Sequence, residues 1–314
     1  SLAPDGKRIA FGARGDVWTV PAKTGITRNL TTTSGVHERD VAWSPDGKYI
    51  AYLSDRTGED EIYITRQDGT GEPVQVTRDA DTYKYGMIWS PDSKKLLWSD
   101  KMLRLQYVDV DSKQVSVVAT SKDWEYTDFS WSPDSRWIAY TDPNSRGSSR
   151  IWLYEGSTGN KFPATDEWYE CSSPVFSNDG KYLVFTSNRD FNPIYSWTEW
   201  NHAFTDMSKV YLITLAKSTP NPFKPENDEV SVKTEEPVAA KPESKPGKPE
   251  EKKEEAAKDK TVKIDAEGIM DRVISLPIDA GTYWNLAAVD ENVYYVKGGS
   301  RGGGKPTLMI YNLK

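Results

Sequence analysis

Histidine and cysteine are the scarcest of the residues that could support hydrolytic or metal chemistry here. The 314 residues include two histidines, His37 and His202, and one cysteine, Cys171. A Ser–His–Asp triad would have to use one of these histidines, and no Gly-x-Ser-x-Gly turn is present to carry a nucleophilic serine. A zinc site needs several clustered histidine or cysteine ligands. The sequence therefore predicts no catalytic residue, no metal site and no cofactor.

Three shorter motifs suggest binding, but each has a plainer interpretation. The Arg-Gly-Asp tripeptide at 14–16 falls where one strand turns into the next, which favours a hairpin turn. The closely spaced aspartates at 79/81 and 109/111 lack the remaining ligands of a calcium loop, so turn formation or solvation is expected. The glycine cluster at 298–305 lacks the spacing of a phosphate-binding loop. We interpret it as a flexible hairpin loop.

The segment "NRDFNPIYSWTEWNHAFTDMSK" (188–209) is too rich in aromatic residues for an ordinary solvated loop. Two interpretations remain open. The segment either packs back as a local core or lines an opening through which extended peptides or other ligands pass. Its candidate rim residues are Tyr195, Trp197, Trp200 and His202.

A second candidate position for an axial channel is the pair Arg39 and Asp40, just before the strand "VAW" at 41–43. The pair could point toward a central channel. An internal ion pair is the plainer interpretation.

The stretch "VAWSPDGKYIAYLSD" (41–55) shows which elements would position these residues. Pro45 favours the first central position of a type I turn, Asp46 suits the second, and Gly47 supplies a left-handed residue. The flanking residues are β-branched and aromatic, so both sides are predicted to be strands. The turn recurs with a spacing of about 41 to 46 residues, at Pro4, Pro45, Pro91, Pro133 and Asn178.

This repeat predicts an all-β fold, a β-propeller of four-stranded antiparallel blades. Five full blades and a partial sixth are present, and the aromatic residue before each turn should fill the wedge between blades. The turn aspartates are then structural rather than a catalytic array: Asp5, Asp46, Asp92, Asp134 and Asp179.

A charged tract interrupts the fifth blade. Residues 1–216 are expected to form blades 1 to 5, including the first three strands of blade 5. Residues 217–262, rich in proline, lysine and glutamate, are expected to be a disordered insert, with partner binding as the minor alternative. Residues 263–314 should supply the last strand of blade 5 and the partial blade 6.

Composition narrows the range of partners. The net charge of −7 argues against nucleic acid or an anionic membrane as the main partner. No stretch approaches the roughly 18 apolar residues of a membrane span. The residues themselves give no cellular location.

Three long strings identify a family. "RIAFGARGDVWTVPAKTGITRNLTTTSGVHERDVAWSPDGKYIAYLSD" (8–55) resembles the start of the second propeller of tricorn proteases and their bacterial homologues. The strings at 188–230 and 262–277 resemble later parts of the same propeller. The likeness covers essentially the whole chain and is more specific than the repeat shared with TolB-like domains.

The resemblance implies a seven-bladed propeller within a large serine peptidase that also has a PDZ domain and a catalytic core. In that family the second propeller is thought to admit and filter peptides, and the catalytic residues lie on other domains. The expected partners are therefore peptides and the PDZ and peptidase domains, in a homo-oligomeric parent. The implied location is cytoplasmic, with the periplasm as an alternative.

Two functions follow as hypotheses. The chain is either a non-catalytic propeller that gates peptides for a tricorn-like peptidase, or a stand-alone TolB-like interaction propeller. A reading frame that continues into PDZ and peptidase sequence would favour the first. A carbohydrate-processing propeller would need a carboxylate pair facing the channel.

Overall fold

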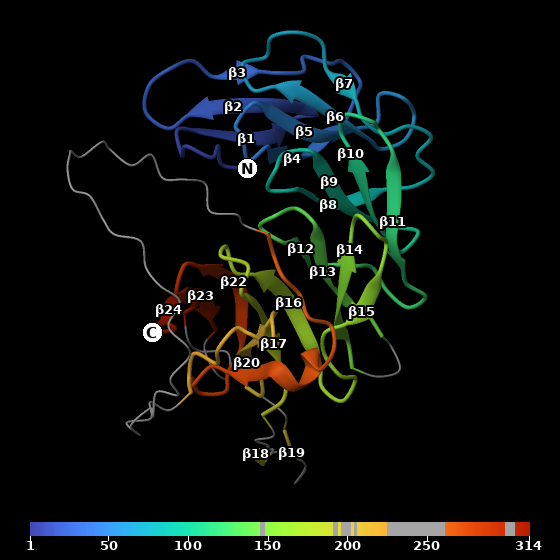
Figure 1. The fold of residues 1–314 in the computed structure, drawn as a ribbon. Helices are drawn as coiled ribbons and strands as arrows, with labels where there is room; N and C mark the ends of the chain where they lie inside the picture. Colours follow the sequence, from blue (N-terminus) through green and yellow to red (C-terminus); the bar gives the residue numbers. More distant parts are fainter. Residues whose placement is uncertain (145–147, 191–193, 196–201, 204–205, 225–260, 299–304) are drawn as a thin grey trace, which may run out of the picture.

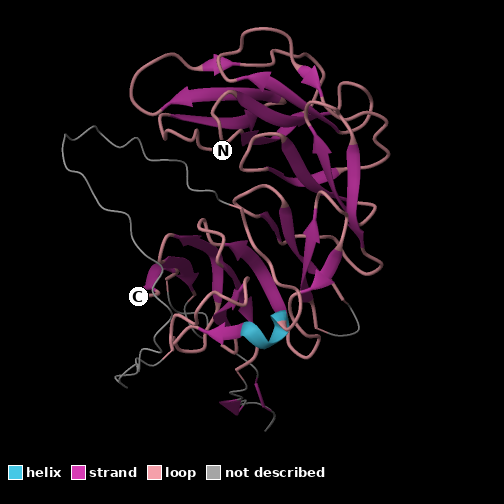
Figure 2. Ribbon diagram, viewed as in Figure 1, coloured by secondary structure: helices cyan, strands magenta, loops and turns pink. Residues whose placement is uncertain are grey.

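The computed structural model shows a fold built almost wholly of β-strands (Figure 2). It describes residues 1–144, 148–190, 194–195, 202–203, 206–224, 261–298 and 305–314. Six antiparallel sheets follow one another in chain order around an arc (Figure 1). The predicted propeller of four-stranded blades is thus confirmed. Among the described residues, no helix is long and apolar enough to cross a membrane.

Each of these six sheets is one blade, and the blades are numbered in chain order. Within a blade, the strands follow one another from the inside of the arc to the outside (Figure 1). Blade 1 comprises β1 (Arg8–Ala13), β2 (Asp16–Pro21) and β3 (Arg28–Asn29). Blade 2 comprises β4 (Glu38–Trp43), β5 (Tyr49–Ser54), β6 (Glu61–Arg66) and β7 (Val74–Gln75). Blade 3 comprises β8 (Lys84–Trp89), β9 (Lys95–Asp100), β10 (Arg104–Asp109) and β11 (Val115–Thr120).

Blades 4 to 6 continue the arc, and blade 5 contains both long excursions of the chain. Blade 4 comprises β12 (Phe129–Trp131), β13 (Trp137–Asp142), β14 (Arg150–Glu155) and β15 (Lys161–Pro163). Blade 5 comprises β16 (Cys171–Phe176), β17 (Tyr182–Ser187), β20 (Lys209–Thr214) and β21 (Val273–Ser275). Blade 6 comprises β22 (Tyr283–Val289), β23 (Asn292–Lys297) and β24 (Thr307–Asn312). A separate hairpin, β18 (Ile194–Tyr195) and β19 (His202–Ala203), lies between β17 and β20, and the short 3₁₀ helix η1 (Ile269–Arg272) precedes β21.

Blade 1 departs from the four-strand pattern. Its inner position is held by Ser1–Ala3, which form a single β-bridge between Leu2 and Ile9. The Ala10 N–H donates to the Ser1 carbonyl at 2.8 Å, so the segment follows the path of an inner strand without its full ladder.

The recurrent turns are closed by their aspartates, as predicted. In the first complete example, Ser44 Oγ donates to Asp46 Oδ1 at 2.7 Å, and the same carboxylate oxygen accepts the Lys48 N–H at 3.0 Å. Gly47 has a φ of 76°, the left-handed conformation that its position requires. Equivalent serine–aspartate bonds occur in the turns of Asp92, Asp134 and Asp179.

Two of these turns place serine where glycine is expected. Ser93 and Ser135 adopt φ values of 60° and 61°, which an L-residue adopts at a cost in free energy. Their hydroxyls compensate by bonding to the preceding blade. Ser93 Oγ accepts the Asp46 N–H, and Ser135 Oγ accepts the Asp92 N–H, each at 3.0 Å. The serines therefore link consecutive turns along one face of the arc.

Replacing Ser135 by alanine is expected to lower the free energy of unfolding by about 1 kcal/mol, because one part-buried hydrogen bond between blades 3 and 4 is lost. Ser157→Ala, at an exposed serine, is the matched control and should change it by less than about 0.5 kcal/mol. Urea denaturation followed by tryptophan fluorescence measures both. Equal effects of the two substitutions would show that the link contributes no stability.

The core is divided into five apolar clusters, one for each contact between neighbouring blades. The aromatic residue before each turn lies in these clusters, as predicted: Trp43, Trp89, Trp131 and Phe176 are all buried. Trp89 also donates its indole N–H to the Ala42 carbonyl of the preceding blade at 3.1 Å. The wedge residues thus join the blades by apolar burial and, at Trp89, by a hydrogen bond.

Candidate functional site

One end of the blades, called here the loop rim, contains the loops that precede the inner strands and the loops that join second to third strands. Because consecutive strands are antiparallel, the Pro-Asp turns all lie at the opposite end, called here the turn face. Arg39 and Asp40, near the start of β4, lie in the loop-rim half of the molecule, as do the strand ends Ser187 and Lys209 that flank the aromatic segment. Among the described residues, the Arg39–Asp40 pair therefore lies at the same end of the blades as the two ends of the aromatic segment.

The inner strands carry a recurrent β-bulge. Their pairing with the second strand shifts register after Arg39, Tyr85, Ser172 and Trp284. Within each bulge one residue is left-handed, namely Asp40, Gly86, Ser173 or Asn285. Bulges disrupt the free edge of a sheet and so prevent pairing with other strands. The inside of the arc is thus bordered by irregular inner edges, and the left-handed residue is polar in three of the four bulges.

Arg39 and Asp40 form an ion pair at 3.3 Å, the plainer of the two sequence interpretations. Arg39 also pairs with the buried Asp60, and its Nη1 donates to the Lys84 carbonyl of blade 3. Lys84 Nζ donates to the Asp60 carbonyl at 2.6 Å and lies 3.8 Å from Glu61. Burial lowers the pKa of Lys84, and the Glu61 and Asp60 carboxylates oppose that shift. Asp40 itself keeps an exposed side chain.

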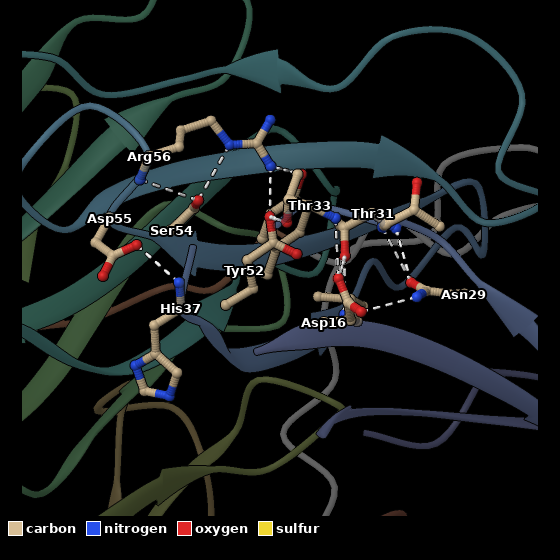
Figure 3. A network of polar contacts seen from close by, with 12 residues as sticks. Asp16, Asn29, Thr31, Thr33, His37, Tyr52, Ser54, Asp55 and Arg56 are labelled. Atoms are coloured by element: carbon tan, nitrogen blue, oxygen red, sulfur yellow. Dashed lines mark hydrogen bonds and ion pairs between the residues drawn. The ribbon is translucent and has the colours of Figure 1, made fainter. Parts of the chain in front are cut away.

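A second polar network joins blades 1 and 2 (Figure 3). The Glu38 carboxylate is completely buried, and its Oε1 accepts bonds from Arg56 Nη2 at 2.5 Å and Thr33 Oγ1 at 3.1 Å. The Arg56 guanidinium also lies 4.4 Å from the ring centroid of Tyr63. Asp16, the acidic residue of the Arg-Gly-Asp tripeptide, accepts the Thr33 N–H at 3.1 Å. The tripeptide is a hairpin turn, as predicted, and its aspartate is committed to this network.

A third contact links the inner strands of blades 4 and 5. Asp128 Oδ2 accepts the N–H of Ser173, the bulge residue of β16, at 3.3 Å. Burial raises the pKa of Asp128, and this hydrogen bond only partly offsets the rise. Asp128 is therefore a half-buried carboxyl beside the inner edge.

The aromatic segment is described only in part. Tyr195 and His202 face each other in the register of the β18–β19 hairpin, which extends beyond the ends of β17 and β20 (Figure 1). Trp197 and Trp200 lie outside the described residues. Near the end of the segment, Ser208 forms a β-bridge with Gly281, which precedes the inner strand of blade 6. Whether it packs as a core or borders an opening stays a prediction.

The remaining motifs have structural partners. Asp81 pairs with Arg104 at 2.5 Å, and Asp109 accepts bonds from the Ser112 N–H and hydroxyl at 2.9 Å. His37 donates its backbone N–H to Asp55 at 2.8 Å (Figure 3). The described residues include no group of three or more histidine, cysteine or acidic side chains placed to hold a metal. The strands on either side of the glycine cluster, β23 and β24, pair antiparallel, and residues 299–304 of the cluster lie outside the described residues.

The full chain, residues 1–314, matches the family described as the tricorn protease second beta propeller domain. This chain belongs to that family. It is 28% identical over 305 residues to tricorn protease homolog 1 of Streptomyces coelicolor, covering 95% of this chain and 27% of that protein. It is 32% identical over 236 residues to the tricorn protease of Thermoplasma acidophilum, covering 70% of this chain and 21% of that protein.

The fold of this tricorn second propeller is similar to part of a solved structure. The crystal structure of the tricorn protease superposes with a TM-score of 0.79 at 19% identity, covering 98% of this chain and 28% of that one. At that identity the likeness concerns the fold alone. The chain thus spans about a quarter of the length of the relatives it matches.

Sequence reasoning missed the aromatic residues that are most exposed among those described in this tricorn propeller. Trp124 and Trp168 are 68% and 83% exposed and lie in the loops that precede β12 and β16, on the loop rim. Each stands in an acidic setting, "DWE" at 123–125 and "DEW" at 166–168. A tryptophan next to acidic residues, outside any alternating strand pattern, was the available signal.

Proposed function

We propose that this chain is the non-catalytic propeller of a tricorn-like serine peptidase and that it admits peptides toward a catalytic core elsewhere in the parent protein. Membership of the tricorn second-propeller family carries this proposal. The relatives are named proteases, and this chain covers only part of their length. In this proposal the peptides and the PDZ and peptidase domains are the partners, and the parent assembles as a homo-oligomer.

The inner edges support passage of an extended chain. An extended peptide could pair with a regular free strand edge and be retained. The bulges at Asp40 and Asn285, both exposed, interrupt that edge and leave polar side chains beside it. A peptide would then slide past rather than bind tightly, which suits a conduit.

The outer faces of blades 1 and 6 support a larger ring. In blade 6, Leu308 and Ile310 are 71% and 56% exposed and lie opposite Val296 and Tyr294 in register, so these four side chains form an apolar patch on one face. In blade 1, Ile9 and Phe11 are exposed on the face turned away from blade 2. Apolar faces of this kind are normally covered. A seventh blade, as the family resemblance implies, would cover both.

Blocking the inner edge tests the proposal in the full-length parent. Asp40→Cys or Asn285→Cys is labelled with a bulky polyethylene glycol maleimide, which Cys171, buried and the only cysteine of these 314 residues, should not accept. The unsubstituted parent, treated with the same reagent, accounts for any labelling outside this chain. Labelling is expected to reduce hydrolysis of peptides of about ten residues at least several-fold, because the label occupies their path. Peptidase assays before and after labelling measure this.

Asp111→Cys, labelled in the same way at an exposed turn, is the control and should leave hydrolysis unchanged. Unchanged hydrolysis after labelling at both inner positions would refute the conduit. A parent protein without peptidase activity would instead favour an interaction propeller.

A further inference from the structure

The exposed aromatic side chains of the described chain gather on the loop rim. Five aromatic side chains are exposed among the described residues. Only one of them, Phe11, lies away from the loop rim, on the face of blade 1 that is turned away from blade 2. The other four precede inner strands: Tyr83, Trp124, Trp168 and Tyr169. A one-sided concentration of exposed aromatic surface is typical of an interaction site.

Both tryptophans are held by local hydrogen bonds. Ser121 Oγ accepts the Trp124 N–H at 3.3 Å and the Asp123 N–H at 3.1 Å. Asp166 Oδ1 accepts the Trp168 N–H at 3.0 Å. Side-chain-capped turns of this kind restrict the backbone. The two indoles are thus displayed from ordered loops, which lowers the entropy lost when a ligand binds.

The rim already shows what its aromatic rings bind. Arg39 lies 5.5 Å from the Tyr83 ring centroid, and Arg189 lies 5.0 Å from that of Tyr169. Each arginine also pairs with a carboxylate, Arg189 with Asp166 at 3.1 Å. Both exposed tyrosines that are described on the rim therefore hold a cation between a ring and an acid. Within the described residues, no cation lies over Trp124 or Trp168.

The loops around the two tryptophans are acidic. Loop 121–128 contains three carboxylates and one lysine, and loop 164–170 contains three carboxylates and no basic residue. Glu167 is 70% exposed, and its pairing with Arg150 at 3.6 Å is the exposed kind that exchanges at little cost. The whole chain has a net charge of −7, which attracts cationic ligands.

We infer that Trp124 and Trp168 bind lysine or arginine side chains of incoming peptides, each indole stacking on the cation while a neighbouring carboxylate pairs with it. This inference rests on the proposed function, because it names the class of peptide that the same rim favours. The occupant is an unfolded, basic peptide segment.

The test compares matched peptides on the full 314-residue chain. A dye-labelled, lysine-rich peptide of about ten residues and the same peptide with every lysine acetylated are titrated by fluorescence anisotropy. The lysine peptide is expected to bind about tenfold more tightly. Trp124→Ala/Trp168→Ala should remove that preference, and Trp124→Phe/Trp168→Phe should retain part of it. Phe11→Ala is the control for loss of an exposed ring and should retain it fully.

The outcomes separate the two ideas. Equal binding of both peptides to the unaltered chain would overturn the cation preference and leave peptide admission standing. Binding of neither peptide would overturn the inference and count against peptide admission. A preference that survives in the double alanine variant, whose circular dichroism confirms folding, would overturn the assignment to these tryptophans.

Discussion

Replacing Arg56 by methionine is expected to destabilise the propeller by about 3–5 kcal/mol, the usual result of removing one partner of a buried ion pair. The Glu38 carboxylate is fully buried, and without Arg56 its one described partner is the Thr33 hydroxyl. Its other oxygen, Oε2, has no hydrogen-bond partner among the described residues. The arginine also packs against the rings of Tyr52 and Tyr63. Urea denaturation measures the free energy of unfolding.

Two further variants separate the charge from the packing. In Glu38→Gln/Arg56→Met the buried charge is gone, so this double variant should be more stable than Arg56→Met alone. Arg136→Met removes an exposed partner of Glu155 and should cost no more than about 1 kcal/mol. If Arg56→Met lowers the free energy of unfolding no more than Arg136→Met does, our account of the contact between blades 1 and 2 is wrong.

Serine at position 180 is expected to cost about 2–4 kcal/mol, although serine occupies the equivalent turn position at 93 and 135. Gly180 has a φ of 70°, and a Cβ there would lie 2.8 Å from Cγ2 of Val262. Val262 is buried between blades 4 and 5, and its N–H donates to Asp134 Oδ2 at 2.8 Å. The returning chain thus occupies the space that the serine hydroxyl uses in the other turns.

Gly47→Ser is the matched control, because Gly47 has a similar φ and nothing lies within 4 Å of its added Cβ. It should show only the backbone cost of about 1–2 kcal/mol. Gly180→Ser should also speed tryptic cleavage after Lys263, since the displaced Val262 releases that segment, and Val262→Ala should restore part of the stability. Equal costs at 47 and 180 would show that Val262 is not held against the turn.

The repeated pattern was sufficient to predict the blades. The turn at Asp46 and Gly47 depends on residues that are close together in the chain, and so does the apolar alternation of the strands. Both can therefore be predicted from the sequence. The same holds for the buried wedge residues Trp43 and Trp89 and for the hairpin at the Arg-Gly-Asp tripeptide.

Contacts between blades could not be predicted, because they join residues about 45 positions apart whose pairing has no local signal. The Ser93–Asp46 link and the Arg39–Lys84 contact are of this kind. Reasoning from the sequence placed Arg39 and Asp40 in a pair, but not the Asp60 and Lys84 beside them.

The sequence by itself determined that similar four-stranded sheets stand side by side, because strand alternation and turn geometry are encoded within each repeat. Tertiary structure alone decided that Trp124 and Trp168 share the loop rim. It also decided that Val262, at the end of the charged tract, packs against the turn at Gly180. The physical reason is that a side chain's exposure and partners depend on which blade packs against it, and that packing exists only once the arc has formed.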